Sequence, residues 1–200
     1  MIKNIIFDIG NVLLDFKPVI YFKDVECKDE VCAHIFNSPY WKEYDLGIKT
    51  LNEVKTCLIK EQVAYQSQIE EILTRWTEVL VERKMVQHLK SLSQKGYAIY
   101  LLSNLSCDAA SYIKERFDLF DLVDGYVLSC EVNAIKPDQE IYQVLLDKYQ
   151  LKPHECIFLD DLKENVETAI MLGMKAVHVV NEEKALEELY ELIEEDQDVE

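Results

Sequence analysis

Short apolar runs alternate with amphipathic segments through most of the chain. The runs 5–7, 99–102, 126–128, 157–159 and 176–180 contain almost only aliphatic and aromatic residues, and each is predicted to be a buried strand. Helical spacing of apolar residues predicts helices between the later runs, at about 107–117 and 138–149, in a segment ending near Gly173, and after residue 182. Strands that alternate with helices indicate an α/β fold with a parallel sheet covered on both sides.

The segment between the first two strands is far longer than a simple connection. A crossover between parallel strands needs only a dozen or so residues, whereas about seventy separate these two. Thr50 and Glu53 form a capping-box pattern at a helix start. A clear apolar stripe at helical spacing follows: Ile69, Ile72, Leu73, Trp76, Val79 and Leu80. We therefore predict a helical subdomain at 16–84, inserted into a core formed by 1–15 and 85–200.

Polar residues follow four of the predicted strands. Asp8 ends the first strand, Ser103-Asn104 follows the second, Lys136 comes a short loop after the third, and Asp160-Asp161 follows the fourth. Each could be only a helix cap, a turn former or a surface charge. Because ligands bind beyond the carboxyl ends of parallel strands, four such positions at one sheet edge indicate a functional site.

Together these residues supply the requirements of phosphoryl transfer. Two or three carboxylates can hold Mg²⁺, which prefers oxygen ligands. One carboxylate can attack phosphorus and form an aspartyl-phosphate. A lysine and a hydroxyl can neutralise the transferring oxygens. Gly10 would let its backbone carbonyl approach the metal closely.

The order Asp8, Ser103, Lys136, Asp160-Asp161 resembles the four motifs of the haloacid dehalogenase superfamily. The resemblance covers nearly the whole chain. It implies a Rossmann-like three-layer α/β/α core, with the helical insertion corresponding to the cap of subfamily I. The opening Phe-Asp-Ile-Gly-Asn-Val-Leu at 7–13, with Asp15 after it, is most similar to sugar-phosphate phosphatases that act on α-glucose 1-phosphate.

The resemblance also implies roles for individual residues. Asp8 is expected to be the nucleophile and a metal ligand. The Gly10 carbonyl and Asp161 are expected to complete the protein ligands of Mg²⁺, with Asp160 in support. Ser103, Asn104 through the backbone around it, and Lys136 are expected to bind the substrate phosphate. The implied activity is Mg²⁺-dependent hydrolysis of a small phosphorylated metabolite, with a sugar phosphate as the expected substrate.

One departure from the family pattern concerns proton transfer. Most phosphatases of the superfamily carry a second aspartate two residues after the nucleophile, as general acid and base, and this position is Gly10 here. Asp15 is the nearest acidic candidate in sequence, although it could equally be structural. A haloacid-type dehalogenase, which needs no such acid, and a weakly active or noncatalytic domain that binds a phosphorylated ligand remain alternatives. The Asp160-Asp161 pair favours a metal-dependent phosphatase over a dehalogenase.

Charge and hydrophobicity exclude some classes of binding partner. The chain has 21 basic and 38 acidic residues, a formal charge of −17, and no basic cluster, so nucleic acid is not an expected partner. Ten acidic residues lie in 182–200, which predicts a solvated acidic face. The N-terminal residues lead directly into a strand and no apolar run has transmembrane length, so we expect a cytoplasmic protein without membrane contact. Nothing in the sequence indicates an oligomeric state.

Other residues are expected to be structural. The six cysteines are scattered without a Cys-x-x-Cys pair, so reduced and mostly buried thiols are predicted. The four histidines, His34, His88, His154 and His178, do not group with the motif residues. Trp41, Tyr44 and Trp76 are predicted to be core residues of the insertion, although one of them could face the substrate.

Overall fold

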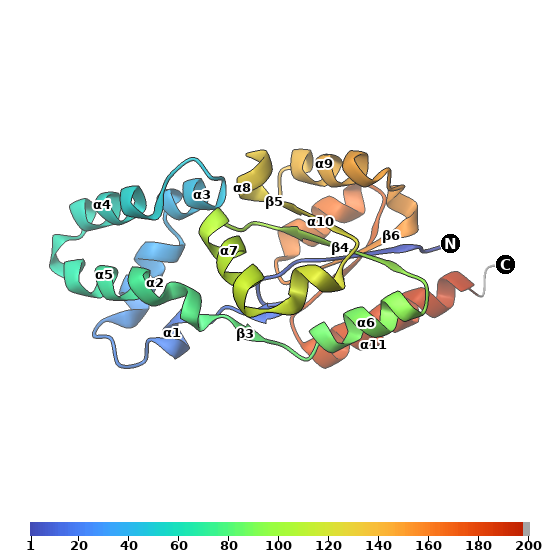
Figure 1. The fold of residues 1–200 in the computed structure, drawn as a ribbon, viewed down its shortest axis with the longest axis horizontal. Helices are drawn as coiled ribbons and strands as arrows, with labels where there is room; N and C mark the ends of the chain where they lie inside the picture. The colour runs from blue at the N-terminus through green and yellow to red at the C-terminus, as the bar shows by residue number, and fades with distance from the viewer. Residues whose placement is uncertain (198–200) are drawn as a thin grey trace.

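The core of the protein is a parallel five-stranded sheet. The computed structural model describes residues 1–197, and the strand order in the sheet is β5-β4-β1-β6-β7 (Figure 1). All four strand pairings are parallel. The strands are β1 (Asn4–Phe7), β4 (Ala98–Ser103), β5 (Gly125–Leu128), β6 (Cys156–Asp160) and β7 (Lys175–His178). The parallel α/β fold predicted from the sequence is confirmed.

Helices cover both faces of this sheet. Side chains alternate along β1, so Ile5 and Phe7 face one layer and Ile6 the other. The first layer is built from α6 (Val86–Gln94), α7 (Cys107–Arg116) and α11 (Glu182–Gln197). The second is built from α9 (Gln139–Tyr149) and α10 (Lys163–Met171). The carboxyl ends of the strands are left open to a ligand.

A helical subdomain extends from the carboxyl edge of the sheet, on the left in Figure 1. We call it the cap. It consists of α1 (Pro18–Tyr21), α2 (Lys28–Phe36), α3 (Pro39–Asp45), α4 (Leu51–Glu61), η1 (Val63–Tyr65), α5 (Gln66–Arg75) and η2 (Trp76–Val79). It has a separate hydrophobic core that includes Val31, Leu58, Ile69 and Trp76. The capping box at Thr50 and Glu53 is present, with both reciprocal hydrogen bonds.

Two short strands lie where the chain leaves and re-enters the core. β2 (Leu14–Asp15) pairs antiparallel with β3 (Val81–Glu82). The insertion was expected to be entirely helical, but it includes β3. A pair of two-residue strands gives no readable periodicity, because it forms only when both ends of the insertion meet. The remaining elements are η3 (Asp118–Leu122), α8 (Ser129–Val132) and η4 (Pro153–Glu155).

The cysteine prediction was wrong for one pair. Cys107 at the start of α7 and Cys130 in α8 form a disulfide, with 5.8 Å between their Cα atoms. They lie 23 residues apart in sequence, and only the pairing of β4 with β5 brings the segments after those strands together. Of the free cysteines, Cys32 and Cys156 are buried, whereas Cys27 is exposed.

The acidic C-terminal helix was expected to form a solvated face, and it also packs against the core. Its Leu189 and Ile193 are buried against the sheet layer. The Glu182 carboxylate accepts a hydrogen bond from the backbone N–H of Met85, and Asp196 accepts one from the backbone N–H of Ile2. Residues 198–200, part of the predicted acidic tail, lie outside the described residues.

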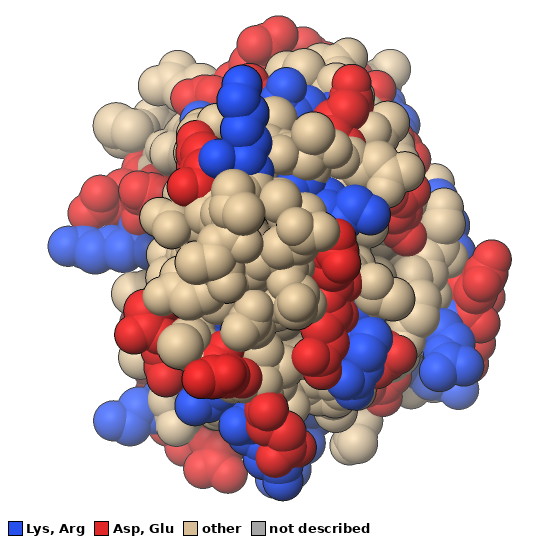
Figure 2. All heavy atoms as spheres, turned by 90° about the vertical axis from the view of Figure 1, so that its left-hand side faces the viewer, with Lys and Arg blue, Asp and Glu red and all other residues tan. Residues whose placement is uncertain are grey.

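The surface shows mixed charge at the cap end. On the face in Figure 2, lysine and arginine side chains are interspersed with aspartate and glutamate. Within residues 1–197, no helix combines the length and apolar character that a membrane span requires.

Gly125, the first residue of β5, packs against a fixed aromatic ring. The Tyr149 hydroxyl accepts a hydrogen bond from the Tyr126 N–H at 2.9 Å and donates one to the Tyr126 carbonyl at 3.1 Å. A Cβ atom at Gly125 would overlap this ring. We expect Gly125→Ala to lower the free energy of unfolding by about 1–3 kcal/mol, because the ring cannot move without breaking both bonds. In a Tyr149→Ala background the same change should be close to neutral in urea denaturation, and an undiminished loss there would contradict the steric explanation.

Candidate active site

Four strand ends bring the predicted site residues to one edge of the sheet. Asp8 follows β1, the central strand, and Ser103 and Asp160 end its two neighbours β4 and β6. Lys136 reaches the same place from the loop after α8. All four residues are buried, with at most 7% of their surface exposed. The parallel register therefore joins residues that lie up to 152 positions apart in the sequence.

Lys136 is the ionic centre of the site. Its ammonium lies 2.8 Å from Asp8 Oδ1 and 2.6 Å from Asp160 Oδ2. Burial lowers the pKa of Lys136, but the charges of Asp8 and Asp160 outweigh this effect and raise the pKa above its usual value. The lysine is therefore charged at neutral pH and holds both carboxylates.

Asp8 has an unusually high proton affinity for an aspartate. Burial raises its pKa to about 7; Lys136 opposes the rise, and the negative charges of Asp160 and Asp161 add to it. The protein alone thus supplies more negative than positive charge around this carboxylate. A bound cation would lower the pKa and keep Asp8 ionised.

Both carboxylate oxygens of Asp160 are engaged within the protein. Its Oδ1 accepts bonds from the Leu162 N–H at 2.8 Å and from the Asn165 side chain at 2.9 Å, and its Oδ2 binds Lys136. These contacts suit a residue that fixes Lys136 and the loop after β6. They support the secondary role that the family resemblance gives to Asp160.

Asp161 is held from two sides. Its carboxylate accepts a 3.0 Å hydrogen bond from the Asn11 side chain, and the Nε2–H of His178 donates to its backbone carbonyl at 2.9 Å. Burial raises the pKa of Asp161, the Asn11 bond lowers it, and the charge of Asp160 raises it further. His178 thus contacts a motif residue, contrary to expectation, because β7 pairs with β6 beside the site.

The donor set fits a divalent cation. One carboxylate oxygen from each of Asp8, Asp160 and Asp161 lies within 4.8 Å of the other two, and hard oxygen donors are those that Mg²⁺ selects. Three carboxylates face a single ammonium, so a dication would balance the charge. With Asp160 engaged by the protein, Asp8, Asp161 and the nearby Gly10 backbone are the residues best placed to hold it.

Asn104 performs a task that its sequence position did not reveal. Its side chain exchanges two hydrogen bonds with the backbone of Lys136, donating to the carbonyl at 2.9 Å and accepting from the N–H at 2.8 Å. This amide fixes the loop that carries the lysine. The expected contact of the Asn104 backbone with phosphate stays a prediction.

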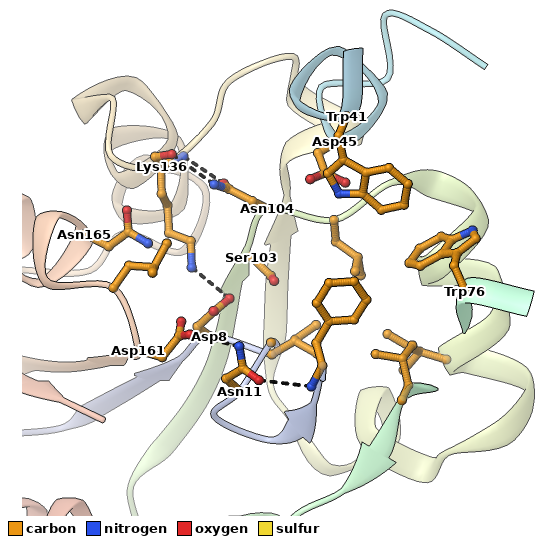
Figure 3. Close-up of a pocket in the computed structure, with 17 residues that line it drawn as sticks. Asp8, Asn11, Trp41, Asp45, Trp76, Ser103, Asn104, Lys136, Asp161 and Asn165 are labelled. Atoms are coloured by element: carbon orange, nitrogen blue, oxygen red, sulfur yellow. Dashed lines mark hydrogen bonds and ion pairs between the residues drawn. The ribbon is translucent and has the colours of Figure 1, made fainter. Parts of the chain in front are cut away.

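A cavity of about 250 Å³ opens above these residues, between core and cap (Figure 3). Asp8, Ser103, Asn104, Lys136 and Asp161 line its core side. Its other walls are mostly apolar and include Phe16, Leu80, Leu105, Ile113, Trp41 and Trp76. Both tryptophans belong to the cap core, as expected, and both also face the cavity.

Three polar residues of the site received no role from the sequence. Asn11 adopts a left-handed backbone with φ of 51°, and its Oδ1 accepts a hydrogen bond from Phe16 N–H. Asn165 joins Asp160 from α10, and Asp45 reaches the cavity from the end of α3. Asn11 and Asn165 stand within five residues of the motif aspartates, a signal that could have identified them. Asp45 stands 37 residues from Asp8 and gave no such signal.

The general-acid candidate Asp15 is placed differently from the other predicted residues. Its carboxylate lies 2.8 Å from the Lys17 ammonium and 3.4 Å from Arg83, and it is not among the residues that line the cavity. It lies in β2, where the chain enters the cap.

A parallel sheet with a buried Asp–Lys–Asp cluster at its carboxyl edge, beneath a helical cap, defines a class of α/β hydrolase. Residues 2–173 match the model of the haloacid dehalogenase-like hydrolases, and the chain belongs to that family. This confirms the resemblance found in the motifs.

Two curated relatives align over nearly the whole chain. A sesquiterpene phosphatase from Aspergillus oryzae is 28% identical over 192 residues, 96% of each chain. A D-ribitol-5-phosphate phosphatase from Bacteroides thetaiotaomicron is 26% identical over 194 residues, 90% of this chain and 93% of that protein.

Solved structures share the fold. One is a family member from Bacteroides thetaiotaomicron in complex with magnesium and inorganic phosphate, with a TM-score of 0.71, 22% identity, and coverage of 89% of this chain and 94% of that one. Another is the L-2-haloacid dehalogenase of Xanthobacter autotrophicus with chloropropionic acid covalently bound, with a TM-score of 0.67, 17% identity, and coverage of 90% and 78%.

The different engagement of Asp160 and Asp161 leads to a test. We expect Asp161→Asn to weaken Mg²⁺ binding by at least the roughly 10–100-fold that loss of an outer partner costs, because a ligand oxygen loses its charge. Asp160→Asn should instead lower the free energy of unfolding by about 3 kcal/mol, because buried Lys136 loses one carboxylate partner. Calorimetric Mg²⁺ titration and urea denaturation of both variants would separate the roles. An equal loss of affinity in the two variants would make Asp160 a ligand of the same rank.

Proposed function

We propose that the protein is a Mg²⁺-dependent phosphatase that hydrolyses a small phosphomonoester through an aspartyl-phosphate on Asp8. The observation that carries the proposal is the buried contact of Lys136 with Asp8 and Asp160, at the floor of a cavity large enough for a small ester. Nucleophile, cation and a carboxylate pair for a metal converge there. The phosphatase names of the two curated relatives support the same activity.

The proposed reaction uses each core residue in a stated way. Ser103, the backbone near Asn104 and the Lys136 ammonium bind the phosphate oxygens and neutralise their charge. An Asp8 oxygen attacks phosphorus, the bond to the ester oxygen breaks, and the alcohol leaves. Water then attacks the aspartyl-phosphate and releases inorganic phosphate. Bound Mg²⁺ would supply a positive charge that lets the anionic phosphate approach Asp8 and keeps the Asp8 carboxyl ionised.

The net charge of the site distinguishes a metal-dependent phosphatase from the dehalogenase alternative. Displacement of halide needs the carboxylate nucleophile but no metal, whereas this site presents three carboxylates to one ammonium. That excess of negative charge favours a metal-dependent reaction. The remaining alternative is a domain that only binds a phosphorylated ligand, and a measurement of phosphate release distinguishes it from an enzyme.

The first test removes the nucleophile or the metal. Asp8→Asn should keep the fold and abolish phosphate release from p-nitrophenyl phosphate, because a neutral amide is too weak a nucleophile to attack phosphorus and form the acyl phosphate. A chelator should abolish the activity of the unaltered protein, and added Mg²⁺ should restore it. Phosphate release and circular dichroism would be measured together. Full activity in chelator, with halide released from a 2-haloacid, would support the dehalogenase instead.

The organic part of the substrate is the finer question. Motif similarity favours a sugar phosphate, and one curated relative is named for a sugar-alcohol phosphate. The cavity walls favour a second candidate, an apolar monoester, because Trp41, Trp76, Phe16 and Leu80 offer little to hydrogen-bond a polyol. The other relative is named for a sesquiterpene substrate. Either class is small, as a cap-covered cavity of about 250 Å³ requires.

A paired screen distinguishes the two classes. We expect kcat/KM for short isoprenyl or alkyl phosphates to exceed that for glucose 1-phosphate, because burial of each methylene contributes about 0.8 kcal/mol. Trp76→Ala should lower kcat/KM for the apolar esters and leave inorganic phosphate inhibition unchanged. A preference for the sugar phosphate, insensitive to Trp76→Ala, would assign the protein to the sugar phosphatases.

A further inference from the structure

The proposed phosphatase reaction leaves one proton unassigned. An alkoxide leaving group needs a proton as the P–O bond breaks, and general acid help is typically worth roughly 10²–10⁴-fold. The residue two positions after Asp8 is Gly10, which has no side chain to donate one. A Cβ built at Gly10 would lie 3.9 Å from Asp8 Oδ2, so the position faces the nucleophile and simply lacks an acid. The proton must come from another group at the cavity.

Reaction geometry points to the cap side of the cavity. Attacking and leaving oxygens lie roughly in line with phosphorus, so the ester oxygen departs away from Asp8. Among the described residues that line the cavity, the ionisable ones are Asp8, Lys136, Asp161 and Asp45. The first three already hold phosphate or metal on the core side. Asp45 is the one that belongs to the cap.

Asp45 lies where an acid for the leaving group is needed. In Figure 3 its carboxyl group lies beside Trp41 at the edge of the cavity opposite Asp8, with Ser103 between them. The side chain is partly exposed because it opens to the cavity. Burial and a hydrogen bond from the Ser106 backbone N–H are the causes that shift its pKa.

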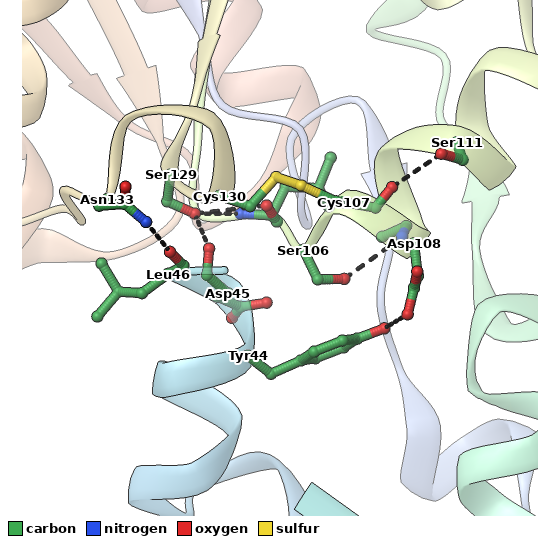
Figure 4. Close-up of a disulfide and its surroundings, with 12 residues drawn as sticks. Tyr44, Asp45, Leu46, Ser106, Cys107, Asp108, Ser111, Ser129, Cys130 and Asn133 are labelled. Carbon is green, nitrogen blue, oxygen red and sulfur yellow. Dashed lines mark hydrogen bonds between the residues drawn. A yellow bond between two sulfur atoms is a disulfide. The ribbon is translucent and has the colours of Figure 1, made fainter. Parts of the chain in front are cut away.

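The backbone around Asp45 is fixed to the core. Ser129 Oγ donates a 2.5 Å hydrogen bond to the Asp45 carbonyl, and Asn133 donates to the Leu46 carbonyl at 2.9 Å (Figure 4). The residue directly before it on the same helix, Tyr44, donates a hydrogen bond from its hydroxyl to Asp108 at 2.7 Å. These three bonds join the end of α3 to α7 and to the α8 segment. Asp45 is thus a cap residue with a position defined by the core, as catalysis requires.

The direction of the shift in the pKa of Asp45 also suits proton donation. Burial raises its pKa well above the usual range of an aspartate, and the hydrogen bond from Ser106 lowers it only in part. A carboxyl group that keeps its proton nearer to neutral pH can give it to an alkoxide. Asp15, by comparison, contacts Lys17 and Arg83 and does not line the cavity.

We propose that Asp45 is the general acid and base of this enzyme, and that it supplies from the cap the carboxyl group missing at Gly10. The proposal rests on the proposed phosphatase function. In the first step Asp8 oxygen bonds to phosphorus, the bond to the ester oxygen breaks, and that oxygen takes the Asp45 proton, which gives the alcohol and an Asp45 carboxylate. In the second step this carboxylate takes a proton from water as the water oxygen bonds to phosphorus. The Asp8–phosphorus bond breaks, and phosphate and the Asp45 carboxylic acid are regenerated.

The test compares two esters of similar shape but different leaving groups. The probes are 4-nitrophenyl phosphate, whose leaving group needs little protonation, and 4-nitrobenzyl phosphate, whose leaving alkoxide needs a proton. In rapid-quench experiments with the Mg²⁺-loaded protein, Asp45→Asn should slow release of 4-nitrobenzyl alcohol by roughly 10²–10⁴-fold. The same variant should release one equivalent of 4-nitrophenol per enzyme at close to the unaltered rate, followed by slow turnover, because the second step has lost its base. The nitrophenol burst also shows that the variant is folded.

Two further variants complete the design. Asp24→Asn, an exposed cap aspartate away from the cavity, is the matched control and should behave as the unaltered protein with both esters. Asp15→Asn tests the competing acid, and a loss confined to the benzyl ester in that variant would overturn the proposal. Equal losses with both esters in Asp45→Asn, or no loss, would overturn it as well. If the unaltered protein releases alcohol from neither ester, the phosphatase function itself is wrong and the role of Asp45 falls with it.

Discussion

The buried ammonium of Lys136 between Asp8 and Asp160 is the contact on which the site depends. A lysine without exposed surface is stable only when carboxylates compensate its lost hydration, and both partners stand at the ends of adjacent strands. The parallel register of β1 and β6 sets the separation of the two carboxylates. The Asn104 side chain fixes the backbone of the lysine from the other neighbouring strand. The positions of the site charges therefore depend both on the pairing of the strands and on the placement of the loop that carries Lys136.

The excess of negative charge in the same cluster favours binding of a cation. Three carboxylates surround one ammonium. Without a metal the pKa of Asp8 is therefore about 7, and its carboxyl group would be only partly ionised at neutral pH. A divalent ion corrects this imbalance and removes the repulsion that an anionic substrate would meet. In the proposed mechanism lysine and metal have separate tasks: Lys136 holds the two carboxylates in place, and the metal would keep Asp8 ionised.

The cap contributes shape and, in the proposed mechanism, chemistry. Its aromatic residues serve both its own core and the cavity wall, so a substitution such as Trp76→Ala tests specificity and cap packing together. Attachment of α3 to α7 and α8 fixes one end of the cap to the residues that follow β4 and β5. The Cys107–Cys130 disulfide joins those same two segments. These contacts therefore constrain the end of the cap that carries Asp45.

The amino-acid sequence alone was enough to predict the order of strands and helices along the chain and the motif residues Asp8, Ser103, Lys136 and Asp160-Asp161. Each signal is local: an apolar run, a polar residue directly after it, a helical stripe. The short β2–β3 pair, the disulfide, the contact of His178 with Asp161, and the position of Asp45 depend on segments that meet only after folding. Asp15 shows the difference most clearly, because proximity in sequence favoured it, whereas the structure pairs it with Lys17 and Arg83 outside the cavity wall. Periodicity specifies which face of an element is buried, but only tertiary packing decides which distant side chains share a cavity.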